Sequence, residues 1–141
     1  PKTSRLYIVD RYSVGRYIRC MRVLANLQEP TFLILAALAG GDLHGYGIIK
    51  EVETLSDGRL RLSAGTLYGA LDRLKNDGLV EVVGEERVGG RLRRYYRLTD
   101  SGVDALQQEI DRQEHVTIVA KAKLEARRAR PAPFTRPAEA S

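Results

Sequence analysis

The sequence has 141 residues but only one cysteine, Cys20, and no tryptophan. A lone cysteine can neither close an internal disulfide nor supply the cysteine cluster of a zinc site. The sequence also has no run of about 18 apolar residues, the length that a membrane-spanning helix needs, and its first residues lack the apolar segment of a secretory signal. These absences predict a cytoplasmic protein with no membrane partner.

Motifs that carry catalytic chemistry are absent as well. The sequence has no nucleophile elbow, no pair of histidines at metal-ligand spacing, and no glycine loop with the lysine that binds phosphate. His44 has no second ligand or nucleophile near it in the sequence, which favours a structural role at the start of a helix over chemistry. We therefore expect a protein that is not an enzyme and that uses no metal or cofactor.

Basic residues are distributed unevenly along the chain. The 23 Lys and Arg against 18 Asp and Glu give a net charge of +5, but both ends of the chain are basic and the middle is slightly acidic. One basic cluster interrupts the middle: the segment from Arg87 to Arg97 contains five arginines and no carboxylate. On a protruding hairpin these arginines would contact DNA phosphates; a solvated hairpin with no partner is the alternative.

The stretch from Ser63 to Tyr96 changes its hydrophobic period twice. Ser63 is a good helix N-cap and Gly78 a good helix end, and the apolar residues between them recur every three or four positions, as in an amphipathic helix. Two β-prone runs follow, 79–83 and 92–98, joined by a turn at 88–91 that contains two glycines. A helix with an exposed polar face followed by an arginine-rich hairpin predicts a winged helix-turn-helix.

Two further helices are expected before this stretch. Pro30 suits the first turn of an apolar helix that runs to Ala39. The next helix begins at 42–44, and its spacing predicts four core-facing residues: Tyr46, Ile49, Val52 and Leu55. Gly45 and Gly47 weaken this helix by about 1 kcal/mol each relative to alanine, so we expect tight packing against a neighbouring helix to explain them.

A long helix is predicted after the hairpin, with Thr99 as its N-cap. Its apolar residues recur at seven-residue spacing, and about 28 helical residues carry more apolar surface than a small winged domain covers. We therefore expect the helix to pair with a second copy in a homodimer; the alternative is that it folds back on its own domain. The dimerisation candidates are Val103, Leu106, Ile110, Thr117 and Leu124.

The predicted fold is therefore mainly α with a small β-hairpin, in the α+β class. Residues 1–28 form a partly helical N-terminal extension, 29–98 the winged helix-turn-helix, 99–126 the dimerisation helix and 127–141 a disordered tail rich in Pro, Ala and Arg. Met21 is a candidate alternative start, in which case the residues before it are not required for folding or binding.

Three segments keep the order and spacing of one known family: LILAALAGGDLHGYGIIKEV, SAGTLYGALDRLKNDGLVE and GGRLRRYYRLTDSG. On these motifs the chain, from residue 27 to residue 124, resembles the PadR family of bacterial transcriptional regulators, in its branch with a short C-terminus. The resemblance implies a homodimeric repressor with a winged helix-turn-helix and a C-terminal dimerisation helix. It also implies release of the repressor by a small-molecule effector, hydrophobic or phenolic.

The resemblance assigns roles within the winged domain. Residues Ala64–Asp77 correspond to the recognition helix and Gly89–Arg94 to the wing. We expect double-stranded DNA as the partner, an inverted-repeat operator with half-sites about one helical turn apart. The DNA-binding candidates are Ser63, Thr66, Tyr68, Gly69, Arg73, Arg91, Arg93 and Arg94. Core packing is an alternative role for Tyr68, and strand alternation predicts that Arg93 and Arg94 point to opposite faces.

Two other classes of function stay open. A winged domain can act as a protein–protein adaptor without binding DNA, and the slightly acidic middle of the chain favours that reading. A small-molecule sensor with a pocket at the dimer interface is the other. The sequence names no operator, regulated gene or effector, and it does not distinguish a repressor from an activator.

Overall fold

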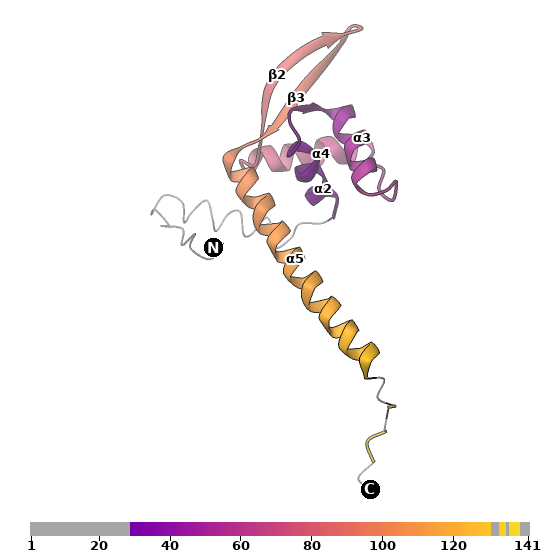
Figure 1. Ribbon diagram of the computed structural model, residues 1–141. Coiled ribbons are helices and arrows are strands. Elements are labelled where there is room, and N and C mark those ends of the chain that lie inside the picture. The colour runs from indigo at the N-terminus through magenta and orange to yellow at the C-terminus, as the bar shows by residue number, and fades with distance from the viewer. Residues whose placement is uncertain (1–28, 131–132, 135, 139–141) are drawn as a thin grey trace, which may run out of the picture. The chain divides into compact units, whose positions relative to one another are not determined.

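The computed structural model describes residues 29–130, 133–134 and 136–138 (Figure 1). The extension predicted for 1–28, with Met21, lies outside these residues. The described chain forms four helices and a three-stranded antiparallel sheet of order β1-β3-β2, which confirms the predicted α+β class. In chain order the elements are α2 Glu29–Leu38, β1 Leu43–His44, α3 Gly45–Leu55, α4 Ala64–Asn76, β2 Val80–Val88, β3 Arg91–Leu98 and α5 Asp100–Ala129.

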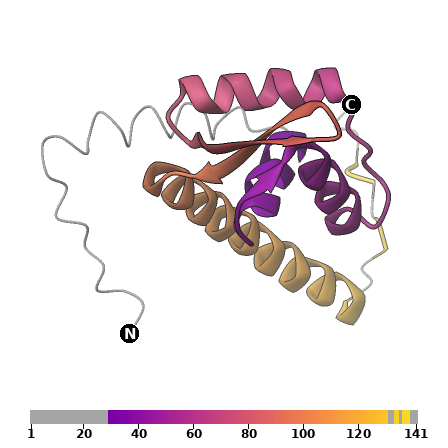
Figure 2. The ribbon, with the colours of Figure 1, turned by 90° about the horizontal axis from the view of Figure 1, so that it is seen from above.

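One compact unit extends to Glu109, and a second unit begins at Ile110 within α5. In the first unit α2, α3 and α4 form a single cluster (Figures 1 and 2), and the β2–β3 hairpin extends beyond it (Figure 1). The largest fully buried aliphatic side chains come from all three helices, from β2 and from the link between α4 and β2: Ile34, Leu35, Ile48, Val52, Leu67, Leu71, Leu74, Leu79 and Val80. The core therefore fixes α4 against its neighbours and leaves most of the hairpin in solvent.

The core-facing side of α3 differs from the expected one by one residue. Val52 is buried as predicted, but Tyr46 is 64% exposed, Ile49 is half-buried and Leu55 is 46% exposed, while Gly45 and Ile48 face the core instead. The cause is the start of the helix, because His44 caps it and Gly45 is its first residue. Only glycine fits at position 45, because a Cβ atom there would lie too close to the hydroxyl of Tyr68.

Gly45 packs tightly against a neighbouring helix, as predicted. A Cβ atom at Gly45 would lie 2.6 Å from the hydroxyl of Tyr68 on α4. Gly47 has a different explanation, because a Cβ there would lie 3.1 Å from Nδ1 of the capping His44. That ring nitrogen accepts a hydrogen bond from the Gly47 N–H at 2.8 Å, which confirms the structural role of His44.

The predicted capping residue Thr99 joins the hairpin to α5. Its Oγ1 accepts a hydrogen bond from the Gly102 N–H at 3.0 Å and donates one to the Gly78 carbonyl at 2.6 Å. A Cβ atom at Gly102 would overlap the Leu79 carbonyl oxygen, so only glycine allows the first turn of α5 to approach β2 this closely. The start of α5 is therefore tied to Gly78 and Leu79, which lie between α4 and β2.

The end of α5 lies beyond the predicted one, because the helix continues to Ala129 rather than 126. The residues at 126–129 are Ala and Arg, which are good helix formers, and Pro131 disfavours a helical conformation only for the residue before it. From Asp111 to Ala129 every residue of α5 is exposed. None of the helices in the described part of the chain is long and apolar enough to cross a membrane.

Candidate nucleic-acid interface

Two hydroxyl groups mark the exposed N-terminal end of α4. Ser63 is the N-cap, as predicted: its Oγ accepts a hydrogen bond from the Thr66 N–H at 3.2 Å and donates one to Thr66 Oγ1 at 2.9 Å. Free N–H groups in the first turn of a helix give its N-terminus a positive potential. Further along α4, Arg73 is exposed and has no ion pair among the described residues. This helix thus presents donors suited to phosphates and base edges.

The exposed face of α4 is also unusually bare. Gly65 and Gly69 are one helical turn apart, and a Cβ atom at either position would have no other atom within 4 Å. Glycine inside a helix costs about 1 kcal/mol relative to alanine, and nothing in the described fold requires it at these two positions. Gly65 was not among the candidates, although its spacing from Gly69 was a signal that could have identified it. The pair leaves room for another molecule to approach the helix backbone.

Tyr68 lies at the edge of this face. Its side chain is 48% exposed while its hydroxyl contacts Gly45 at the start of α3. The ring therefore packs between the two helices and keeps one side in solvent. This arrangement combines the two roles predicted for Tyr68 and does not select one of them.

The hairpin turn is built from two glycines in left-handed conformations. Gly89 and Gly90 have φ angles of 58° and 78°, as in a two-residue type I′ turn. Val88 pairs with Arg91 beside the turn, and a β-bulge between Val82 and Gly84 shifts the register of β2 by one residue. The first strand is longer than the predicted run of 79–83, because β2 continues to Val88, and β3 begins one residue before the predicted run of 92–98.

The register brings carboxylates to the arginine cluster, which the sequence order had concealed. We call Glu85, Glu86, Arg93 and Arg94 the wing stem, because Glu85 pairs with Arg94 and Glu86 with Arg93 across the strands. Arg94 Nε lies 3.1 Å from Glu85 Oε1, and the Tyr95 hydroxyl donates to Glu86 Oε2 at 2.8 Å. Strand alternation places Arg93 and Arg94 on opposite faces, as predicted.

Uncompensated positive charge is thus concentrated at the outer end of the hairpin. We call residues 87–92 the wing tip; it holds Arg87 and Arg91 and no carboxylate. Among the described residues, no ion pair involves Arg87, Arg91 or Arg93. Arg87 belongs to the basic cluster but is not among the DNA-binding candidates predicted from the sequence, because its place near Arg91 at the tip depends on the strand pairing. The tip is the part of the wing best suited to bind phosphate.

The root of the hairpin is held by a bidentate ion pair. Arg97 Nε and Nη2 lie 2.8 and 2.7 Å from the two carboxylate oxygens of Asp42, and the Arg97 guanidinium lowers the pKa of that carboxyl below its ordinary value of 3.8. β1 adds two residue pairs, Leu43 with Tyr96 and His44 with Tyr95. Arg97 is consequently engaged in fixing the wing to the helices rather than free for DNA.

Tyr96 connects the wing with α4. Its side chain is 5% exposed, as predicted for a core residue, and burial raises the pKa of its hydroxyl. Smaller contributions in the same direction come from Tyr68 and Asp72 on α4, while Arg94 lowers the pKa. The hydroxyl of Tyr96 in β3 therefore interacts electrostatically with side chains of α4.

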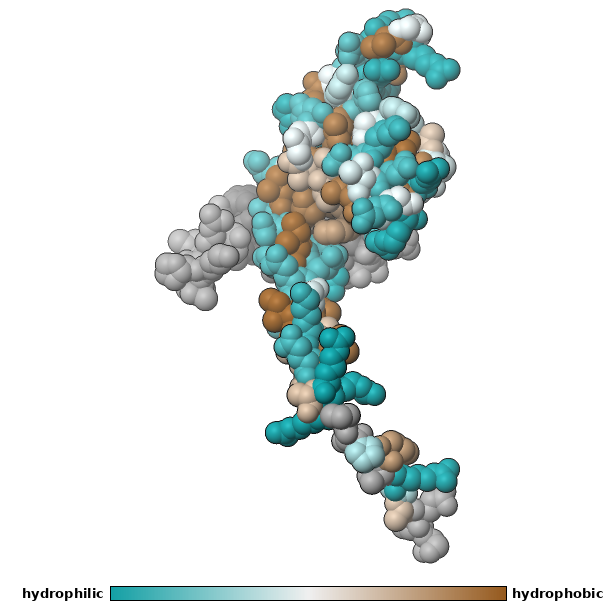
Figure 3. Space-filling view, turned by 45° about the vertical axis from the view of Figure 1, so that its right-hand side comes forward, coloured by the Kyte–Doolittle hydropathy of each residue, from teal (hydrophilic) through white to brown (hydrophobic). Residues whose placement is uncertain are grey.

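The dimerisation candidates fall into two groups. Val103 is 52% exposed, Leu124 is 53% exposed and Thr117 is exposed, whereas Ile110 is half-buried. Leu106 is only 6% exposed in the chain itself, so its place in the apolar repeat reflects the core of the first unit and it offers little surface to a partner. Figure 3 shows hydrophobic side chains exposed along α5. In the part of α5 that belongs to the second unit of the chain, the large exposed ones are Val116, Ile118, Val119 and Leu124.

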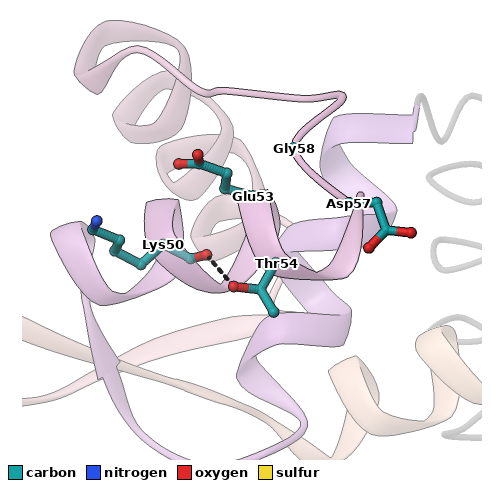
Figure 4. Close-up of a pocket in the computed structure, with 5 residues that line it drawn as sticks. All are labelled: Lys50, Glu53, Thr54, Asp57 and Gly58. Carbon is teal, nitrogen blue, oxygen red and sulfur yellow. Dashed lines mark hydrogen bonds between the residues drawn. The ribbon is translucent and has the colours of Figure 1, made fainter.

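A surface pocket beside α3 is polar. Its lining comprises Lys50, Glu53, Thr54, Asp57 and Gly58 (Figure 4). The Thr54 hydroxyl donates to the Lys50 carbonyl at 3.1 Å, and Glu53 lies 3.2 Å from Arg61. Three of the five lining residues are charged, and the described residues include no group of three metal-ligating side chains.

Comparison with known proteins decides between a generic winged domain and a particular family. The family model of the transcriptional regulator PadR-like family matches residues 34–108, more than half of the chain. The chain belongs to the PadR-like family. This membership confirms the resemblance seen in the sequence and places the chain in a family of transcriptional regulators.

Individual PadR-like relatives agree with the family match. The transcriptional regulator YqjI of Escherichia coli is 33% identical over 95 residues, 67% of this chain and 44% of YqjI. The transcriptional regulator Rv3488 of Mycobacterium tuberculosis is 44% identical over 77 residues, 54% of this chain and 67% of that protein. A PadR family transcription regulator from Clostridium difficile has a TM-score of 0.58 at 27% identity, covering 69% of this chain and 99% of that structure. The chain spans less than half the length of the first curated relatives that it matches.

Proposed function

We propose that this PadR-like chain is a homodimeric, cytoplasmic repressor that binds an inverted-repeat DNA operator through α4 and the wing tip. The observation that carries the proposal is the exposed face of α4. It combines hydroxyls at Ser63 and Thr66 with two glycines that the fold itself does not require. A bare helix face beside hydrogen-bonding groups suits close contact with a DNA groove.

Each element has a distinct task in this proposal. The exposed face of α4 enters the major groove, where Thr66 near its start and Arg73 in its last turn reach base edges and the Gly69 backbone lies close to the DNA. Ser63 and the Tyr68 hydroxyl bind backbone phosphate. Arg91 and Arg87 at the wing tip contact phosphates or the adjacent minor groove.

A second copy of the chain supplies the two-fold symmetry. The proposed interface is the exposed side of α5 and includes the predicted positions Val103, Ile110, Thr117 and Leu124. Burial of such side chains between two copies stabilises a dimer. Two recognition helices then contact half-sites about 34–36 Å apart, which is one helical turn of DNA.

Repression follows if the operator overlaps a promoter, because the bound dimer blocks transcription. A small hydrophobic or phenolic effector that binds at the apolar interface would release the operator by changing the spacing of the recognition helices. The polar pocket beside α3 is a poor candidate for such a ligand because its lining is charged. The interface between the two copies is the better one.

Selection of bound duplexes from a random DNA pool tests the proposal. We expect enrichment of an inverted repeat, a dimer by light scattering, and loss of the complex with one class of candidate phenolic ligands. A transcription assay on the selected sequence then gives the sign of regulation. If no duplex is enriched over the starting pool at moderate salt, DNA binding is refuted and the protein–protein adaptor becomes the leading function.

A further inference from the structure

The wing stem contains two carboxylates where a DNA-binding wing would be expected to carry only positive charge. Glu85 and Glu86 are consecutive and exposed, and each lies directly across the strands from an arginine. Glu85 Oε1 accepts from Arg94 Nε at 3.1 Å on the inner face, and Glu86 Oε2 accepts from the Tyr95 hydroxyl at 2.8 Å on the outer face. Each face of the stem therefore carries one carboxylate and one arginine.

Stability of the hairpin does not account for these carboxylates. The side chains of Arg94 and Glu85 are 54% and 50% exposed, and ion pairs with this exposure contribute little to folding. The hairpin already has a two-residue glycine turn and a continuous ladder from the bulge to the turn. Near DNA, in contrast, a carboxylate repels every phosphate within several ångströms.

We propose that Glu85 and Glu86 are specificity-determining residues that confine phosphate contact to the wing tip. Glu85 holds Arg94 away from DNA, and both carboxylates repel the phosphate backbone along the stem. This inference rests on the DNA binding proposed above and adds to it a pair of residues that weaken non-specific phosphate contact.

The consequence is a larger ratio of operator affinity to general DNA affinity. Contacts between cations and phosphates carry no sequence information, and they supply nearly all of the affinity for random DNA. A wing that binds only through Arg87 and Arg91 contributes fewer such contacts than a wing with four available arginines. The base contacts of α4 then account for a greater share of the total affinity, which raises discrimination.

The test compares the full chain with an E85Q/E86Q variant on a random-sequence duplex and on the selected operator. Glutamine keeps the size of each side chain and removes its charge. We expect affinity for the random duplex to rise roughly threefold for each carboxylate removed, the effect of a unit charge several ångströms from a phosphate in water. The slope of log affinity against log salt should steepen by about 0.9 for each arginine that becomes engaged. The ratio of operator to random affinity should fall.

Two further variants distinguish the effect of the position of Glu85 and Glu86 from the effect of net charge alone. E81Q removes the same charge from the same strand, but at the root of the hairpin, opposite Arg97, which Asp42 already holds. It should leave the random-duplex affinity close to that of the wild type. In an R94Q background the gain from E85Q should shrink, because part of the effect of Glu85 passes through Arg94.

The outcomes distinguish this inference from the proposed function. If the wild-type chain binds no duplex, the proposed function fails and the inference fails with it. If the wild type binds and E85Q/E86Q shows the same affinity and salt slope, the inference alone is overturned. A variant with weaker binding and a lower Tm would also overturn it, because the carboxylates would then serve the fold of the wing.

Discussion

Replacement of Gly69 by alanine should make the protein more stable and a poorer DNA binder at the same time. Gly69 lies in the interior of α4, and a Cβ atom there would meet no other atom within 4 Å. Alanine would therefore gain helix propensity without any steric cost. The expected stabilisation is about 1 kcal/mol, which corresponds to a rise in Tm of roughly 4–8 °C for a domain of this size.

The effect on DNA should have the opposite sign. On the proposed function the open space above Gly69 is occupied by the operator, and a methyl group would intrude into that contact. We expect operator affinity to fall roughly tenfold, the equivalent of about 1.4 kcal/mol. Thermal unfolding followed by circular dichroism and fluorescence anisotropy with a labelled duplex measure the two effects on the same sample.

A matched control separates the contact from helix propensity. Asn76→Ala also improves the propensity of α4, but at its last residue and without adding atoms to the glycine face. This variant should gain stability and keep its operator affinity. A Gly69→Ala variant that is stabilised and binds the operator as tightly as the wild type would refute the assignment of this helix face to DNA.

Three other predictions concern separate parts of the chain. Arg87→Ala with Arg91→Ala should weaken binding to operator and random duplexes alike and reduce the salt slope by about 0.9 per lost phosphate contact; an unchanged slope in anisotropy titrations removes the wing tip from the interface. Asp42→Asn should lower Tm at neutral pH, where the lowered pKa of Asp42 keeps it charged beside Arg97. Stability from a lowered carboxyl pKa is present above the ordinary value of 3.8 and lost as pH falls through the folded value, so wild type and variant should converge in strong acid, and a constant difference would contradict the ion pair as the cause. Leu124→Asp, at a position 53% exposed in the chain, should give a folded monomer by light scattering with reduced operator affinity; a dimer of unchanged strength excludes this part of α5 from the interface.

Features set by local sequence were predictable in this protein. The caps at Ser63 and Thr99 depend on a hydroxyl within three residues of a free N–H, and the turn at Gly89-Gly90 depends on two residues that tolerate positive φ. The buried stripe of α4 likewise follows from spacing within one helix. In each case the partners lie within a few positions of each other, so the sequence contains the whole interaction.

Features set by pairing across the fold were not predictable. Without the bulge between Val82 and Gly84, Glu85 would pair with Arg93, and Arg87 with Arg91. The single extra residue moves each carboxylate by one position, and the hydrophobic pattern of β2 does not indicate where that residue lies. The buried side of α3 was misplaced for a similar reason, because its start depends on the contact between Gly45 and Tyr68.

A seven-residue apolar repeat is also ambiguous, because it does not distinguish residues that pack in the core of their own chain from residues that pack against a second copy. Leu106 and Leu124 both belong to the repeat, yet the first is 6% exposed and the second 53% exposed. The boundary between their environments coincides with the division of the chain between Glu109 and Ile110. Burial in the chain's own core is therefore what distinguishes a domain residue from an interface candidate within one continuous helix.

The contacts at the root of the wing determine how a change in α5 reaches the recognition helix. Gly102 in the first turn of α5 lies against the Leu79 carbonyl, and Thr99 donates to the carbonyl of Gly78, both directly after α4. A rotation of this turn cannot occur without displacing Leu79, because Gly102 leaves no space between the two backbones. The wing tip is connected to α5 less directly, through the length of β2 and β3. In the proposed dimer, a rearrangement of the first turn of α5 would therefore act on the C-terminal end of α4 more directly than on the wing tip, and it would change the spacing of the two copies of α4.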